Sequence, residues 1–206
     1  VFAGDIGFAD GGGDTAEAGV LGNTVIGNAN TTSIDFQEDL YSFGTGTTNI
    51  QAATGHTIDA TKNADTIEFK TAATSISFET GDIDLDDGTN LSIASSGGAI
   101  TVFGIAGDSD EVVTINADGG STSTETVSLG DVGDSGHTQI HTLTVTADDG
   151  ITLTGNIYTS ADSSSAGDVT FNDKVIIDGA VRIDTDNTGD TTATDGIIKF
   201  TTSIQS

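Results

Sequence analysis

The segment TIEFKTAATSISFETGDIDLDDGTNLSIASSGGAITVF (66–103) decides the fold of this chain. Within each of its short runs, apolar residues stand two apart, as in Ile67/Phe69 and Ile76/Phe78. A period of two residues is typical of a strand with one buried face and one wet face. The apolar runs begin at 67, 76, 83, 91 and 100, so only a few residues remain for each corner. We expect one core to be lined by Ile67, Phe69, Ile76, Phe78, Ile83, Leu85, Leu91 and Ile93.

The composition favours a folded, all-β chain. Of the 206 residues, 49 are Leu, Ile, Val or Phe, a larger share than in disordered chains of high net charge. Ile and Val make up 33 of these 49, and β-branched side chains favour strands. Asp accounts for 26 of the 32 acidic residues, and Asp prefers turns whereas a surface helix prefers Glu. The composition therefore predicts strands and tight corners with almost no helix.

Similar short runs continue through TVSL (126–129) and TLTV (142–145) to IIKF (197–200). The chain also resembles itself, since GAITVFGI (98–105) is similar to GITLTGNI (150–157). These features favour a parallel β-solenoid, in which strands separated by corners stack into parallel sheets. An antiparallel β-sandwich is the alternative fold. No segment has the length of a domain linker, so we expect residues 1–206 to form one solenoid segment of a longer repetitive fibre.

Three segments carry a resemblance to a known family: ADDGITLTGNI (147–157), GDVTF (167–171) and VRIDTDNTGDTTATDGIIKFTTSI (181–204). They resemble the repeats of filamentous-haemagglutinin-type β-helices, which occur in very large bacterial surface adhesins. The resemblance is one of style, is strongest over 140–204, and contains no diagnostic residue. It implies a parallel β-helix in an extracellular fibre or adhesin.

The net charge excludes several classes of partner. The chain carries a formal charge of −27 with only five Lys and Arg. Nucleic acid is not expected as a partner, because neutralising phosphates needs basic side chains. No stretch approaches the roughly 20 apolar residues of a membrane-spanning helix, so membrane insertion is not expected. The absence of Cys excludes disulfides and thiolate metal sites, and an extracellular or cell-surface location is compatible with the absence of Cys and Met.

Enzymatic activity is not expected. Glycoside hydrolysis uses paired carboxylates, but acids are so abundant here that no pair stands out. Aromatic platforms for carbohydrate are limited to two Tyr and nine Phe, most of which stand at inward strand positions. A carbohydrate or other surface ligand stays open, and a polysaccharide-active β-helix enzyme is a remote alternative.

The segment DTDNTGD (184–190) is the best candidate for a metal site, and a solvated loop without metal is the alternative. Its carboxylates and hydroxyl follow the spacing of a calcium-binding loop, and Ca²⁺ prefers oxygen ligands of this kind. The expected Ca²⁺ ligands are Asp184, Asp186, Thr188, Asp190 and Asp195. A second acidic segment, GDIDLDDG (81–88), is better explained as a strand with a wet acidic face, because Ile83 and Leu85 alternate with Asp.

The two histidines His137 and His141 stand four residues apart. On a helix this spacing suits zinc, but the neighbouring Gly and β-branched residues favour a strand. Two strand residues four apart lie about 13 Å from each other, which is too far for one metal ion. We expect both histidines to be surface residues.

These features predict a mechanical function. The open ends of a solenoid expose unpaired strand groups, which template pairing with further strands. FAGDI (2–6) resembles LTGNI (153–157), so the chain is expected to begin and stop partway through a repeat. The expectation is a structural component of an extracellular bacterial fibre, sheath or adhesin stalk that assembles end to end with copies of itself, as a homopolymer or as tandem repeats. The alternative is a β-sandwich subunit of a filament or surface layer, joined by strand donation.

Overall fold

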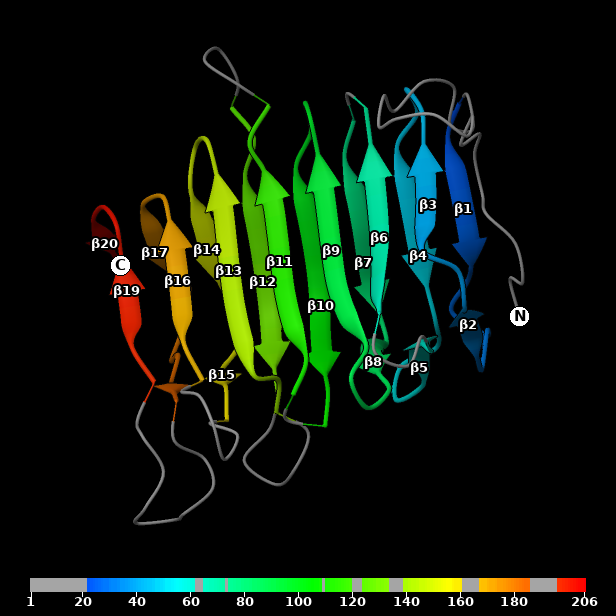
Figure 1. Cartoon of the computed structure of the whole chain (residues 1–206). Helices are drawn as coiled ribbons and strands as arrows, with labels where there is room; N and C mark the ends of the chain where they lie inside the picture. Colours follow the sequence, from blue (N-terminus) through cyan, green and yellow to red (C-terminus); the bar gives the residue numbers. More distant parts are fainter. Residues whose placement is uncertain are drawn as a thin grey trace.

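The computed structural model is a parallel β-solenoid whose strands stack into long walls (Figure 1). It describes residues 22–61, 65–72, 74–108, 110–119, 124–133, 139–160, 167–185 and 196–206. Within these residues every strand pair is parallel and no helix forms. The predicted all-β solenoid is confirmed, and the antiparallel sandwich is wrong.

Each turn of the solenoid contributes a strand to each of three walls. The first wall contains β1 (Thr24–Gly27), β4 (Thr48–Gln51), β7 (Ile76–Thr80), β10 (Ile100–Ala106), β12 (Val127–Val132), β14 (Ile151–Leu153), β17 (Val175–Ile177) and β20 (Ile204–Gln205). The second wall contains β2 (Ile34–Phe36), β5 (Thr57–Ala60), β8 (Asp82–Leu85), the ends of β10 and β12, β15 (Ile157–Tyr158) and β18 (Ile183–Asp184). The third wall contains β3 (Leu40–Phe43), β6 (Thr66–Thr71), β9 (Asn90–Ser95), β11 (Val112–Ala117), β13 (Thr142–Ala147), β16 (Val169–Asn172) and β19 (Ile198–Phe200).

The register places apolar residues of successive turns directly above one another. In the first wall the column at the strand starts is Ile76, Ile100, Val127, Ile151 and Val175. Successive partners in this wall are 24 to 29 residues apart, as in Ile76 with Ile100 and Val175 with Ile204. The predicted similarity between 98–105 and 150–157 is also confirmed. Their last residues, Ile105 and Ile157, occupy equivalent positions on the turns before and after Val132, and both pair with it.

All eight residues predicted to line the core do so. None of their side chains is more than 1% exposed, and they belong to one continuous hydrophobic cluster. Toward the N-terminal end the cluster is aromatic: the ring of Phe69 packs edge-on against Phe36 at 4.9 Å and against Phe78 at 5.2 Å between centroids. The core is therefore a stack of β-branched and aromatic layers that runs the length of the described solenoid.

Asp and Asn side chains fasten successive turns at the corners. Asp131 Oδ1 accepts a hydrogen bond from the backbone N–H of Asn156 at 2.7 Å, and Asn156 Oδ1 accepts one from the N–H of Arg182 at 2.9 Å. Asp168 does the same for the N–H of Ile197 at 2.7 Å. The donor lies 25 to 29 residues further along the chain in these three bonds. The abundance of short acidic and amide side chains thus serves contacts between turns as well as turn formation.

Truncating an inward Phe should cost far more stability than truncating its outward neighbour. Phe78 is completely buried, whereas Phe103 on the adjacent strand is 49% exposed. We expect Phe78→Ala to lower the free energy of unfolding by about 3–5 kcal/mol, and Phe103→Ala to lower it by less than about 1 kcal/mol. Urea denaturation of the two variants measures both values. Equal losses would show that the assignment of inward and outward faces is wrong.

Candidate functional site

The predicted calcium ligands lie mostly outside the described residues. Asp186, Thr188, Asp190 and Asp195 fall within 186–195, which the structure does not describe. Asp184 is described in β18, where its carboxylate accepts a hydrogen bond from the guanidinium of Arg182. Among the residues that are described, no group of three or more His, Asp or Glu side chains is placed to hold a metal ion. The calcium site therefore stays a prediction.

The prediction for the second acidic segment is confirmed, and the prediction for His141 is wrong. In GDIDLDDG (81–88), Ile83 and Leu85 are buried and Asp82 is exposed, as predicted for a wet acidic face. His137 lies outside the described residues. His141 is only 8% exposed, so the prediction of a surface residue is wrong. Its Nδ1 lies 3.0 Å from the carbonyl oxygen of Ser160 on the next turn, to which it donates.

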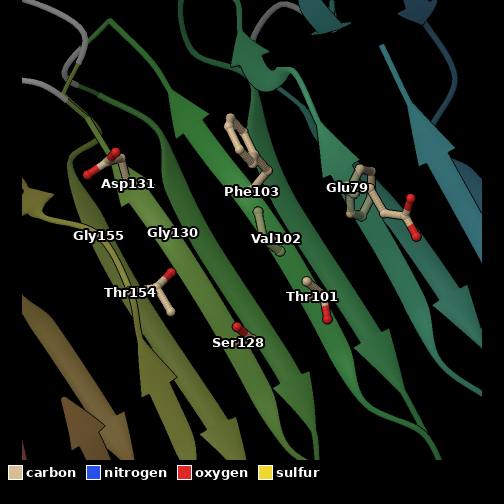
Figure 2. A pocket seen from close by; sticks show the side chains of 10 residues that line it. Glu79, Thr101, Val102, Phe103, Ser128, Gly130, Asp131, Thr154 and Gly155 are labelled. Carbon is tan, nitrogen blue, oxygen red and sulfur yellow. The ribbon is translucent and has the colours of Figure 1, made fainter. Parts of the chain in front are cut away.

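A hollow of about 270 Å³ lies on the outer side of the first wall (Figure 2). It crosses four successive strands, from β7 to the end of β14, and one exposed aromatic ring, that of Phe103, stands in it. The hydroxyls of Thr101, Ser128 and Thr154 also line the hollow. An aromatic surface combined with a few polar groups in a concave site is the usual composition of a small-molecule site.

Glycine residues create the space beside Phe103. Val102 pairs with Leu129, so Gly130 is the outward neighbour of Phe103 on the following turn. A Cβ at Gly130 would collide with the carbonyl oxygen of Phe103, and a Cβ at Gly155 would collide with the backbone N of Asp131. Both positions therefore need Gly because the backbones approach closely. The consequence is a floor without side chains next to an aromatic ring.

Carboxylates lie on both sides of the ring. Figure 2 shows Asp131 and Glu79 on opposite sides of Phe103, and both line the hollow. A third carboxylate, that of Asp82, lies against the backbone of Gly104. A Cβ added at Gly104 would collide with the Oδ1 of Asp82. Burial, and then the charge of Asp131, raise the pKa of Asp82. No Lys, Arg or His lines the hollow, so its electrostatic potential is that of uncompensated carboxylates.

A second polar feature, at the corner that leads into β11, centres on Glu111. Its side chain is completely buried, and its two carboxylate oxygens accept hydrogen bonds from the backbone N–H groups of Asp108 at 2.9 Å and Asp110 at 3.2 Å. Burial, together with the side chain of Asp110, raises the pKa of Glu111 to about 7 despite these N–H groups. Because Glu111 is fully buried and is held by backbone N–H groups, its protonation affects the stability of the fold.

The C-terminal face of the solenoid is an open apolar surface. Ile198 in β19 is 39% exposed and Ile204 in β20 is 53% exposed. These strands form one end of the molecule in Figure 1, and within the described residues each pairs with a strand on one side only. At the opposite end, Phe36 and Tyr41 of the first described turn are completely buried. The two ends of the described solenoid are therefore different.

Sequence reasoning missed both Phe103 and Glu111. Phe103 could have been found, because Ile100 and Val102 fix the inward phase of the strand and so place Phe103 outward. Glu111 gave no such signal, since its burial depends on the turn that follows it. In that turn, the backbone N–H groups of His141 and Thr142 donate to the backbone carbonyl oxygen of Glu111.

Comparison with protein-family models, with curated proteins and with solved structures finds no match for this chain. The solenoid fold is compatible with β-helix repeats, but no family is shown. Among the described residues there is also no helix with the length and hydropathy needed to cross a membrane.

The raised pKa of Glu111 makes stability depend on pH in a defined direction. The folded state binds the proton more tightly than the unfolded state, whose pKa is near 4.5. The contribution of Glu111 is therefore fully present below about pH 4.5 and is lost as the pH rises to about 7. The loss amounts to roughly 3 kcal/mol, from about 1.4 kcal/mol per pKa unit.

We expect Glu111→Gln to flatten the fall in unfolding free energy between pH 4.5 and pH 8.5, as measured by urea denaturation at each pH. Gln keeps only one of the two acceptor oxygens, so absolute stabilities are not compared. The quantity to compare is the slope of unfolding free energy against pH in the variant and in the wild type. Glu79→Gln, which removes an exposed carboxylate, is the control and should leave the slope nearly unchanged. Identical slopes for wild type and Glu111→Gln would contradict the raised pKa.

Proposed function

We propose that this chain is a structural component of an extracellular bacterial fibre, sheath or adhesin stalk, built by end-to-end stacking of solenoid segments. The observation that carries the proposal is the exposure of core positions at the C-terminal face. The role is mechanical and non-catalytic, and it supplies length and stiffness. The resemblance to filamentous-haemagglutinin-type repeats supports the same class of protein.

Each exposed residue of the end face continues a column of residues that is buried in the turns before it. Ile198 ends the column of Ile67, Leu91, Val113, Leu143 and Val169 in the third wall, and each of these five side chains is at most 1% exposed. Ile204 ends the first-wall column, whose apolar members from Ile76 to Val175 are completely buried. Only the absence of a further turn distinguishes Ile198 and Ile204 from these residues. One more turn would bury both.

The backbone of the last turn leads to the same conclusion. β19 pairs with β16, and β20 pairs with β17, and among the described residues neither has a partner on its other side. An edge strand of this kind accepts another strand through its unpaired N–H and C=O groups. In the proposed fibre this strand is supplied by a tandem segment of the same polypeptide or by a second copy of the chain.

The charge suits a long, exposed fibre. A net charge of −27 keeps the polymer soluble and repels neighbouring fibres from side to side. End-to-end contact is much less affected, because the exposed residues of the end face include Ile197, Ile198 and Ile204. Growth along the axis is thus favoured over lateral aggregation. A sandwich subunit joined by strand donation does not fit, since the fold is a parallel solenoid.

Placing charges on the end face should prevent association. We expect the wild-type chain to form elongated particles as its concentration rises, and the double variant Ile198→Lys/Ile204→Lys to stay monomeric. Analytical ultracentrifugation gives the mass and shape of the particles. The matched control is Phe103→Lys/Val112→Lys, which adds the same charge at two exposed apolar residues of the side walls in the middle turns. Compact wild-type monomers at every concentration, or equal association of the two double variants, would contradict the proposal.

Calcium is a further proposal for the acidic loop that begins at Asp184. Carboxylates at the corners offer the hard oxygen ligands that Ca²⁺ prefers. Chelation at fixed ionic strength should lower the melting temperature of the wild-type chain, and Asp184→Ala should remove most of that response. A matched Arg182→Ala variant separates loss of the ion pair between Arg182 and Asp184 from loss of a calcium ligand. A melting temperature that is unaffected by chelation would exclude a strong calcium site.

A further inference from the structure

The hollow around Phe103 has an apolar centre and an acidic group on either side. The ring of Phe103 and the side-chain-free floor at Gly130 form the centre, and Glu79 and Asp131 lie on opposite sides of the ring (Figure 2). Glu79 belongs to β7 and Asp131 to β12, with β10 between them. Two strand spacings separate them along the solenoid axis, about 10 Å.

This arrangement selects the charge of a ligand. Anions such as phosphates, sulfates and uronates would meet Glu79, Asp131 and the nearby Asp82 with no basic side chain in the lining to offset them. A cation would instead relieve the repulsion between Asp82 and Asp131, which, after burial, is the second cause of the raised pKa of Asp82. Positive charge also attracts the face of an aromatic ring. The ligand is therefore cationic.

The spacing selects the shape of the cation. A single small ion can neutralise one carboxylate but makes no use of an exposed aromatic ring between two of them. An extended molecule with a positive group at each end and methylene groups between them matches the hollow at all three places. From this geometry we propose that the hollow binds an aliphatic diamine or a longer aliphatic polyamine, held along the solenoid axis across Phe103.

Each part of the ligand has a defined partner in this binding mode. One ammonium group donates to the carboxylate of Asp131, whose Oδ1 already accepts the N–H of Asn156. The other ammonium group donates to Glu79. The methylene chain covers the ring of Phe103 and the floor at Gly130, and the hydroxyl oxygens of Ser128 and Thr154 face the same space as acceptors. The site is independent of the end face, so it concerns the wall of the solenoid whether or not the chain forms fibres.

Titrations that compare a diamine with a monoamine test the proposal. Cadaverine and spermidine are added to the ¹⁵N-labelled wild-type chain at fixed ionic strength, with pentylamine as the monoamine control. We expect the amide signals of Gly104, Gly130 and Gly155 to shift, and cadaverine to bind about two- to fivefold more tightly than pentylamine, as one additional exposed ion pair allows. Equal affinities, or shifts that do not include these glycines, would overturn it.

Three variants assign the parts of the site. Glu79→Gln and Asp131→Asn should each reduce cadaverine binding to the pentylamine level, and Phe103→Ala should weaken both amines by about two- to fivefold. Asp87→Asn removes one exposed carboxylate that does not line the hollow and controls for net charge. Circular dichroism confirms that each variant is folded. If Asp87→Asn weakens cadaverine as much as Glu79→Gln does, or if Mg²⁺ shifts the same amides with an affinity that Phe103→Ala leaves unchanged, the site is a general cation atmosphere and the proposal is wrong.

Discussion

Parallel, in-register stacking is the constraint on which the rest of this structure depends. Each turn presents apolar residues at the same positions as the turn before, so Phe171 lies under Phe200 just as Phe69 lies next to Tyr41. A single turn cannot bury its inward face alone, and stability comes from the turns on either side of it. The walls are therefore held in register while the corners vary in length, which is why successive partners in the first wall are 24 to 29 residues apart.

Much of this fold follows from the sequence, because period-two alternation fixes the face of each residue. The eight predicted core residues are buried and the strands over 66–103 are found where the alternation places them. β1 and β4 were missed since TVIG and TNIQ alternate weakly, and Thr24 and Thr48 stand in the column that holds Ile or Val from Ile76 onward. β15 and β20 contain only two residues each, which is too short for any period to be visible.

The features that bear on function were harder to predict, because they arise between turns. Glu111 and His141 are buried by residues of other turns. The corner Asp and Asn residues were expected to cap their own turns, but several bond to the next turn. The hollow needs Phe103 beside Gly130, and these two residues become neighbours only through the register of β10 and β12. Local patterns thus predict the walls, whereas the surface features depend on the register.

The register itself can be measured, because the chain contains no Cys and accepts spin labels at chosen positions. Glu68, Ser92, Thr114, Thr144, Thr170 and Lys199 form one outward column of the third wall. Labels at Glu68→Cys and Lys199→Cys are five strand spacings apart along this column, about 24 Å between backbones. Double electron–electron resonance on dilute, monomeric chains should give one narrow distance distribution near this value. A broad distribution, or a narrow one that differs by more than the reach of the label linkers, would contradict the stacked solenoid and the end face derived from it.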